Sequence, residues 1–247
     1  MTRMLASVAA LGEVEQALSF GADLIDLKDP CQGALGAWPL DAIPAAVRLV
    51  GGRTAVSATI GDLPMRPELV AEAAGRTADT SVDIVKVGFF EQGNFRSCIE
   101  ALGAVARRGV RLVAVLFADR KPDLDLLPAL AAAGFYGVML DTADKQGGGL
   151  RDHLGDPDLD RFVSLGRNAG LLTGLAGSLA VRDVPLLAAL EPDYLGFRGA
   201  LCRGADRTAG LDRAAFQSIR EALSRRATAA AGAQCAAQGA AAGVPGK

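Results

Sequence analysis

Residues 22–30 read ADLIDLKDP, a short apolar run that leads into a charged end and stops at a proline. Successive side chains of a β-strand point to opposite faces, so Asp26 and Lys28 would lie on the same face, two residues apart. A carboxylate and an amine at the mouth of a sheet or barrel suggest an active amine with a proton-handling neighbour. A surface ion pair at a strand end is the alternative interpretation of this run alone.

Similar apolar runs recur along the chain and alternate with longer amphipathic segments. The runs expected to form strands are Met4–Val8, Leu24–Lys28, Thr54–Ile60, Ile84–Phe89, Arg111–Phe117, Gly137–Thr142, Leu171–Gly177 and Tyr194–Gly199. The segments expected to form helices are Leu11–Phe20, Pro39–Val50, Pro67–Asp79, Asn94–Arg108, Pro122–Ala133, Asp156–Ala169, Val181–Leu190 and Leu211–Arg226. Eight strand–helix pairs with near-continuous apolar strands predict an α/β fold, a single-domain (β/α)8 TIM barrel with parallel strands.

A doubly wound open sheet would show the same alternation. However, the Gly-x-Gly-x-x-Gly motif expected after its first strand is absent, since residues 8–12 contain one glycine. We therefore expect residues 1–226 to form the barrel domain. Residues 227–247 are rich in alanine and glycine, without an amphipathic pattern, and are predicted to be a disordered tail.

Composition narrows the class of partner. Of the 247 residues, 50% are hydrophobic and 5% aromatic, and the formal net charge is -2, without a basic stripe. These values predict a soluble domain that binds no nucleic acid. No apolar stretch approaches the ~20 residues of a membrane span, so we expect no membrane partner and a cytoplasmic location. The four cysteines form no CxxC pair and His153 is the only histidine, so no metal site is expected.

In a barrel of this type, catalytic groups lie at the carboxyl ends of the strands. Lys86 lies inside the apolar run IVKVG at residues 84–88, where an uncompensated ammonium would be costly. Alternatively, Lys86 faces outward between the helices, with Val85 and Val87 in the interior. Barrel interiors stack in layers from alternate strands, so Lys28, Lys86 and Asp141, from strands two, four and six, can share one layer. With Asp26 this makes two amines and two carboxylates around one cavity, and Lys145 follows Asp141 by four residues; which lysine has the lowered proton affinity stays open.

Small residues follow strands seven and eight, where barrel loops commonly bind phosphate through backbone N–H groups. Gly177-Ser178 and Gly199-Ala200 fit this role, Arg198 could add charge, and Ser57 on strand three is a further candidate for substrate binding. Two ordinary tight turns are the alternative. Residues 203–207 are interpreted as a solvated helix entry in preference to an anion contact, and His153 as a surface or capping residue.

At these residues the sequence resembles a known family, (5-formylfuran-3-yl)methyl phosphate synthase, the first enzyme of methanofuran biosynthesis in methanogens, with relatives in methylotrophic bacteria. The resemblance runs in order from about residue 5 to residue 225. The motifs that carry it are residues 22–30 with GALGA at 33–37, SATIGD at 57–62, IVKVG at 84–88, MLDTADK at 139–145, LAGS at 175–178 and RGA at 198–200.

The resemblance implies a barrel lyase that condenses two glyceraldehyde 3-phosphate molecules into 4-(hydroxymethyl)-2-furancarboxaldehyde phosphate, with loss of phosphate and water. It implies that Lys28 forms a Schiff base and that Lys86 acts as general base. Asp26, Asp141 and Lys145 would assist proton transfer and phosphate elimination. The expected partner is a phosphorylated triose, no cofactor is needed, and we expect a homo-oligomer. A Schiff-base aldolase that acts on another sugar phosphate, and a non-catalytic barrel that binds a phosphorylated metabolite, are the alternatives.

Overall fold

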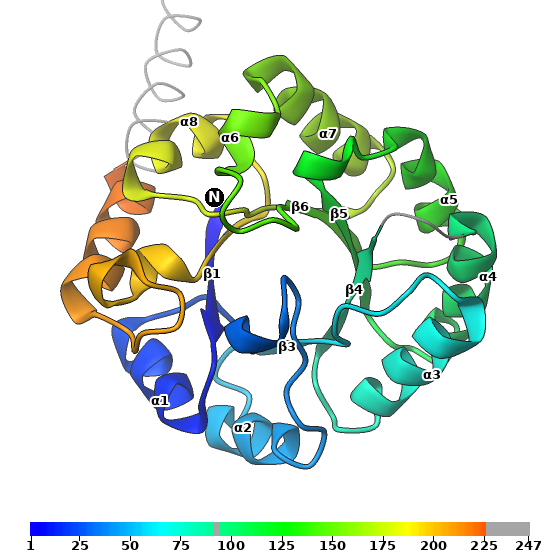
Figure 1. The fold of residues 1–247 in the computed structure, drawn as a ribbon, viewed down its shortest axis with the longest axis horizontal. Helices are drawn as coiled ribbons and strands as arrows, with labels where there is room; N and C mark the ends of the chain where they lie inside the picture. The colour runs from blue at the N-terminus through cyan, green and yellow to red at the C-terminus, as the bar shows by residue number, and fades with distance from the viewer. Residues whose placement is uncertain (91–93, 226–247) are drawn as a thin grey trace, which may run out of the picture.

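The computed structural model describes residues 1–90 and 94–225. It is a closed barrel of eight parallel strands in the order β1-β2-β3-β4-β5-β6-β7-β8, and β1 also pairs with β8. Helices surround the barrel, as the view down its axis shows (Figure 1). The predicted (β/α)8 fold is therefore confirmed. The tail predicted for residues 227–247 lies outside the described residues.

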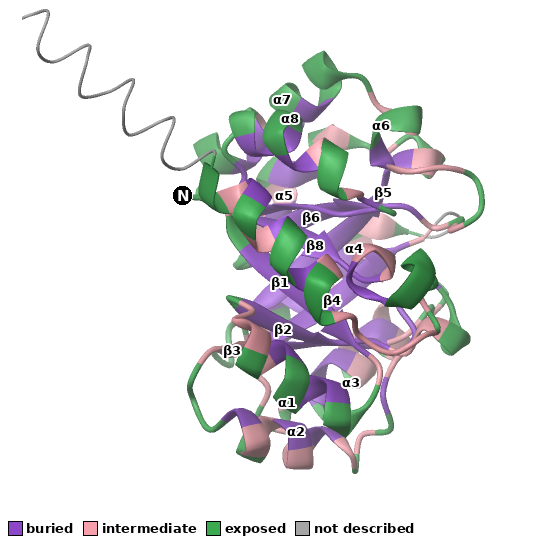
Figure 2. Ribbon diagram, turned by 90° about the vertical axis from the view of Figure 1, so that its left-hand side faces the viewer, coloured by how far each residue is buried: buried purple, intermediate pink, exposed green. Residues whose placement is uncertain are grey.

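The strands are short and close to their predicted positions. They are β1 (Arg3–Val8), β2 (Leu24–Leu27), β3 (Ala55–Thr59), β4 (Ile84–Phe89), β5 (Leu112–Phe117), β6 (Gly137–Asp141), β7 (Leu172–Leu175) and β8 (Tyr194–Phe197). Nearly all of their side chains are buried, which explains why the runs read as continuously apolar (Figure 2).

The helices are α1 (Leu11–Phe20), α2 (Ile43–Val50), α3 (Pro67–Ala78), α4 (Phe95–Ala106), α5 (Leu127–Ala132), α6 (Leu150–His153), α7 (Asp156–Asn168) and α8 (Val184–Ala189). Residues 213–225 are also helical. Short 3₁₀ turns are η1 (Pro30–Gln32), η2 (Ala118–Arg120), η3 (Leu124–Leu126), η4 (Val181–Asp183), η5 (Gly199–Leu201) and η6 (Arg203–Ala205). The four-residue α6 was not predicted.

Local sequence signals explain where several helices begin and end. Pro67 opens α3, where the missing N–H would have had no partner within the helix. Helix α1 ends at Gly21, whose φ of 88° is left-handed, a conformation glycine adopts without steric cost. The segment predicted to be helical from Pro39 starts only at Ile43.

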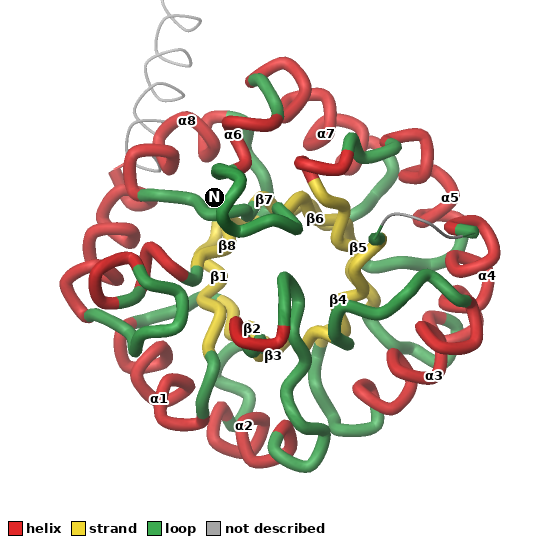
Figure 3. The backbone as a smooth tube through the Cα atoms, in the orientation of Figure 1, coloured by secondary structure: helices red, strands yellow, loops and turns green. Residues whose placement is uncertain are grey.

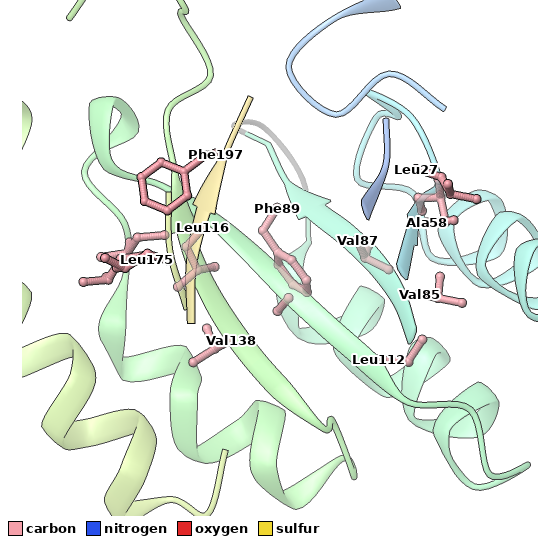
Figure 4. Packing of buried hydrophobic residues seen from close by; sticks show 14 of the residues in the cluster. Leu27, Ala58, Val85, Val87, Phe89, Leu112, Leu116, Val138, Leu175 and Phe197 are labelled. Atoms are coloured by element: carbon pink, nitrogen blue, oxygen red, sulfur yellow. The ribbon is translucent and has the colours of Figure 1, made fainter. Parts of the chain in front are cut away.

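The core is divided into two layers by the alternation of side chains along the strands. An outer cluster packs between the strands and the helices, and it contains Val85 and Val87 (Figure 4). Lys86, between them, points to the barrel interior and is 2% exposed. The alternative in which Lys86 faces outward is therefore wrong.

An inner apolar cluster forms the floor of the barrel interior. Leu24, Ile84 and Met139 belong to it, and each precedes a charged residue by two positions along its strand. Each of these charged residues, Asp26, Lys86 and Asp141, therefore lies on the interior face, on the carboxyl side of the floor residue that precedes it.

The loops after β2 and β6 extend over this end of the barrel (Figure 3). The first loop is tied down by Asp62, which accepts the N–H groups of Ala34 and Leu35 at 2.7 Å each. Within the described ranges, no helix is long and apolar enough to cross a membrane.

Candidate active site

A cavity of about 530 Å³ opens at the carboxyl ends of the strands. The strand residues that line it include Ser7, Lys86 and Asp141, and the loop residues include Lys28 and Lys145. Its remaining wall comes largely from the segments after β7 and β8. The cavity is therefore where a barrel of this type places its reactive groups.

The deepest of three lysine–aspartate ion pairs described at the cavity joins Lys86 to Asp26, with 3.1 Å between Nζ and Oδ1. Ser57 donates a hydrogen bond to Oδ1 of Asp26 at 2.6 Å, and Ser7 donates one to Oδ2 at 3.0 Å. Asp26 is fully buried. Both of its oxygens thus have partners, as a buried carboxylate requires.

Burial and charge shift the proton affinities of this pair in a definite way. Burial alone would raise the pKa of Asp26, but the charges of Lys86 and Lys28 outweigh it, and the pKa is lowered. Burial lowers the pKa of Lys86, the attraction of Asp26 restores it only in part, and the charge of Lys28 lowers it further. Lys86 is therefore easier to deprotonate than an ordinary lysine.

The other two ion pairs share Asp141 and lie closer to the mouth. Lys28 Nζ is 3.4 Å from Asp141 Oδ2, and Lys145 Nζ is 2.6 Å from Asp141 Oδ1. The backbone N–H of Thr142 also donates to Oδ1 at 2.8 Å. Burial would raise the pKa of Asp141, but Lys145 and Lys28 hold it well below the usual range. Burial lowers the pKa of Lys145, which Asp141 offsets only in part.

The structure thus brings the five predicted catalytic residues together, with a pairing that differs from the expected one. Asp26 and Lys28 do face the same interior, but the closest cation to Asp26 is Lys86, and the carboxylate beside Lys28 is Asp141. Ser57, predicted as a substrate contact, is 1% exposed and bonded to Asp26, so it orients that carboxylate.

The predicted phosphate turns line the cavity. Gly177 has a φ of 109° and Ser178 a φ of 49°, so the chain turns sharply after β7. Among the described residues, no acceptor is found for the backbone N–H groups of Gly177 and Ser178. Gly199 and Ala200 form the adjacent wall. Unpaired N–H groups at a turn can bind an anionic oxygen.

Arg198 reaches the cavity wall, but its guanidinium is already fully engaged. It pairs with Glu13 through Nη1 and Nη2, and it also donates to the backbone oxygens of Ser7, Arg207 and Ala209. A guanidinium has five N–H donors, and all five are used. The positive charge of Arg198, predicted from the sequence to help bind phosphate, is therefore neutralised by Glu13.

Sequence reasoning missed three residues of the site and its supports, and it placed a fourth, Arg207, in a solvated segment. Ser7 and Glu13 are described above, and Asp119 accepts the N–H groups of Ala143 and Asp144 at 2.8 Å each, beside Lys145. Arg207 lines the cavity, so the interpretation of residues 203–207 as a solvated helix entry is wrong for this residue. Ser7 could have been found, since it lies near the end of a strand on the interior face.

Two further predictions concern histidine and cysteine. His153 is half-buried at the end of α6, and its Nε2 atom is buried without a partner among the described residues, so it is not simply a surface residue. Cys31, Cys98 and Cys202 are free, and position 235 lies outside the described residues. In the same ranges, no cluster of three or more His, Cys, Asp or Glu side chains could hold a metal ion.

Comparison with known proteins gives a consistent result. A family profile described as 4-HFC-P synthase matches residues 4–220. The protein named (5-formylfuran-3-yl)methyl phosphate synthase of Archaeoglobus fulgidus is 34% identical over 90% of this chain and 99% of its own length. A Methylorubrum extorquens relative, provisionally named for the same activity, is 45% identical over 90% of this chain and 91% of its own length.

Solved structures resemble this chain at the level of the fold. The 3-hexulose-6-phosphate synthase of Salmonella typhimurium has a TM-score of 0.63 at 19% identity, covering 91% of this chain and 100% of that one. The 3-keto-L-gulonate-6-phosphate decarboxylase of Vibrio cholerae has a TM-score of 0.65 at 14% identity, covering 91% and 98%. Both likenesses indicate the fold alone.

Proposed function

This chain belongs to the 4-HFC-P synthase family, and we propose from this premise that it is a Schiff-base lyase of methanofuran biosynthesis. Its substrates are two molecules of glyceraldehyde 3-phosphate. Its products are 4-(hydroxymethyl)-2-furancarboxaldehyde phosphate, inorganic phosphate and two molecules of water. The observation that carries the proposal is the pair of buried lysine–aspartate contacts, Lys28–Asp141 and Lys86–Asp26, facing one cavity.

Lys28 is the nucleophile in this proposal. It lies at the mouth of the barrel just after β2, and it is 6% exposed, whereas Lys86 is 2% exposed and lies deeper. After losing a proton, the Lys28 amine attacks the carbonyl carbon of a triose phosphate, and loss of water gives an imine. The imine withdraws electrons from the adjacent carbon and makes its proton acidic.

Lys86 then acts as the general base. Its lowered pKa increases the fraction of neutral amine near neutral pH. It takes the proton next to the imine and gives an enamine, whose carbon attacks the aldehyde of the second triose. Asp26 assists this step because its carboxylate stabilises the ammonium form of Lys86 that results.

Asp141 and Lys145 serve the later steps. Lys145 is an ammonium hydrogen-bonded to Asp141 at the cavity wall, where it can donate a proton to a leaving phosphate or hydroxyl oxygen. Phosphate and water are eliminated, the furan ring closes, and hydrolysis of the imine restores Lys28. The imine supplies the electron sink, so the proposal invokes no cofactor.

Incubation with glyceraldehyde 3-phosphate as the sole substrate tests the reaction. We expect a furan aldehyde, detected by its absorption band, and released inorganic phosphate in equal molar amounts. Formation of only a hexose phosphate or dihydroxyacetone phosphate would instead assign a Schiff-base aldolase.

Reduction with borohydride in the presence of substrate tests the nucleophile. Mass spectrometry should find the adduct on the peptide that carries Lys28, and Lys28→Met should abolish both adduct and turnover. Lys121→Met is the matched control, because Lys121 is exposed and outside the cavity lining. A Lys28→Met variant with full activity would rule out the Schiff-base role, and wild type without adduct or turnover would favour a non-catalytic barrel.

A further inference from the structure

The segment after η5 carries Arg207 and is fastened to the barrel by a buried arginine. Arg198 Nε donates to the carbonyl oxygen of Arg207 at 2.7 Å, and its Nη2 donates to that of Ala209 at 3.1 Å. Glu13, on α1, holds Arg198 from the other side through both of its carboxylate oxygens. The backbone at Arg207 is therefore held in a fixed position relative to the cavity.

The side chain of Arg207 forms part of the cavity wall and keeps donors unused. Its Nη2 donates to the carbonyl oxygen of Gly33 at 3.0 Å, which joins the segment to the loop after β2. In the described part of the chain, Arg207 has no carboxylate within ion-pair distance. A half-buried guanidinium without a carboxylate partner is a candidate for binding an anionic ligand.

The surroundings of Arg207 match a phosphoryl group in particular. Gly177 and Ser178, whose backbone N–H groups have no acceptor among the described residues, line the same cavity, as does Lys145. A Cβ atom added to Gly199 would lie 3.1 Å from the carbonyl oxygen of Ala205, so glycine at this position lets the segment that carries Arg207 pack closely against the cavity wall. A guanidinium and unpaired backbone N–H groups around one cavity are typical of a site that recognises phosphate.

We propose that Arg207, together with the N–H groups of Gly177 and Ser178, forms the subsite for the phosphoryl group of the substrate. Arg207 is the residue that distinguishes a phosphorylated from an unphosphorylated aldehyde. Arg198, with Glu13, is the positioning residue that holds Arg207 at the cavity. The identity of the substrate rests on the proposed function; the preference of this subsite for phosphate does not.

The first test compares Arg207→Gln with Arg203→Gln. Arg203 lies in the same segment, is exposed and is outside the cavity lining, so the control removes the same charge without touching the subsite. In borohydride trapping at Lys28, the half-saturating concentration of glyceraldehyde 3-phosphate should rise roughly 10- to 100-fold in Arg207→Gln, as expected for a lost charged hydrogen bond. The half-saturating concentration of unphosphorylated glyceraldehyde should stay unchanged in Arg207→Gln. In Arg203→Gln, the half-saturating concentrations of both aldehydes should match those of the wild type.

Two outcomes would overturn the proposal. An equal rise for both aldehydes would mean that Arg207 supports the cavity without recognising phosphate, and no rise for either would place the phosphoryl group elsewhere.

A second test is independent of imine formation. Calorimetric titration with inorganic phosphate should show binding that weakens in Arg207→Gln and persists in Arg203→Gln. If wild type forms no adduct but this difference in phosphate binding is found, the proposed function fails and the subsite stands. If phosphate binds the two variants equally well, the subsite fails whatever the adduct experiment shows.

Discussion

Replacement of Asp26 by asparagine tests the assignment of Lys86 as the base, because the two residues form the deepest lysine–aspartate ion pair of the site. The amide has the shape of the carboxylate. Its oxygen can still accept from Ser57, and its NH₂ group can donate to the hydroxyl oxygen of Ser7, which donates in the wild type. The substitution therefore removes the charge with little change in packing.

The size of the effect follows from the 3.1 Å between Lys86 Nζ and Asp26 Oδ1. Coulomb's law at an effective dielectric constant of about 20 gives an attraction of about 5 kcal/mol for this pair. The amide oxygen retains part of it. About 1.4 kcal/mol changes a protonation equilibrium tenfold, so the change in the pKa of Lys86 should be large enough to measure. Asp26 raises the pKa of Lys86, so its removal must lower that pKa further.

The assay is kcat/KM for furan formation as a function of pH. A base must be neutral to act, so activity rises with pH as Lys86 loses its proton, and this acid limb should move to lower pH in Asp26→Asn. Asp206→Asn is the matched control, since Asp206 is an exposed carboxylate at the cavity and makes no contact with Lys86. An acid limb that stays in place, or that moves to higher pH, would refute Lys86 as the titrating base.

Four further outcomes are expected. Lys86→Met should leave borohydride trapping at Lys28 largely intact and abolish turnover; equal loss of both would assign Lys86 a structural role. Asp119→Asn removes the charge that binds the N–H groups of Ala143 and Asp144, so the loop carrying Lys145 should loosen and kcat fall about tenfold, as for a lost charged hydrogen bond, with trapping unchanged. Glu13→Ala leaves Arg198 buried without its carboxylate and should lower the free energy of unfolding by about 3–5 kcal/mol in urea titrations. The wild type should lose stability in acid, because the folded-state pKa values of Asp26 and Asp141 lie below the ordinary 3.8. The stability that these two carboxylates contribute is complete above that value and is lost as the pH falls through the folded-state values. Urea titrations at stepwise lower pH can follow this loss.

The barrel could be predicted from the sequence because its signals are local. Each strand is a short buried run, and the alternation around Lys86 is enough to place Val85 and Val87 against the helices once the lysine faces inward. The carboxyl ends of the strands then identify the candidate residues without any knowledge of distances.

The pairing within the site could not be predicted because it depends on how neighbouring strands are staggered. Two residues along a strand are about 6.6 Å apart, so Asp26 and Lys28 share a face but occupy successive levels of the barrel. Each then meets a charge from another strand. The Glu13–Arg198 pair spans 185 positions and forms only because β1 closes the barrel against β8, which no local pattern reveals.

The two carboxylates are shared unequally, which is consistent with the different roles proposed for Lys28 and Lys86. Asp26 forms an ion pair with Lys86 and accepts hydrogen bonds from two hydroxyl groups. This arrangement suits a base that gains and loses a proton without moving. Asp141 is shared by Lys28 and Lys145. In the proposed mechanism, Lys28 turns toward a carbonyl carbon to form the imine. Lys145 then still neutralises Asp141, so no buried carboxylate is left unpaired, which would be strongly unfavourable. A nucleophilic lysine at this position therefore needs a second cation on its carboxylate, and Lys145 meets that need.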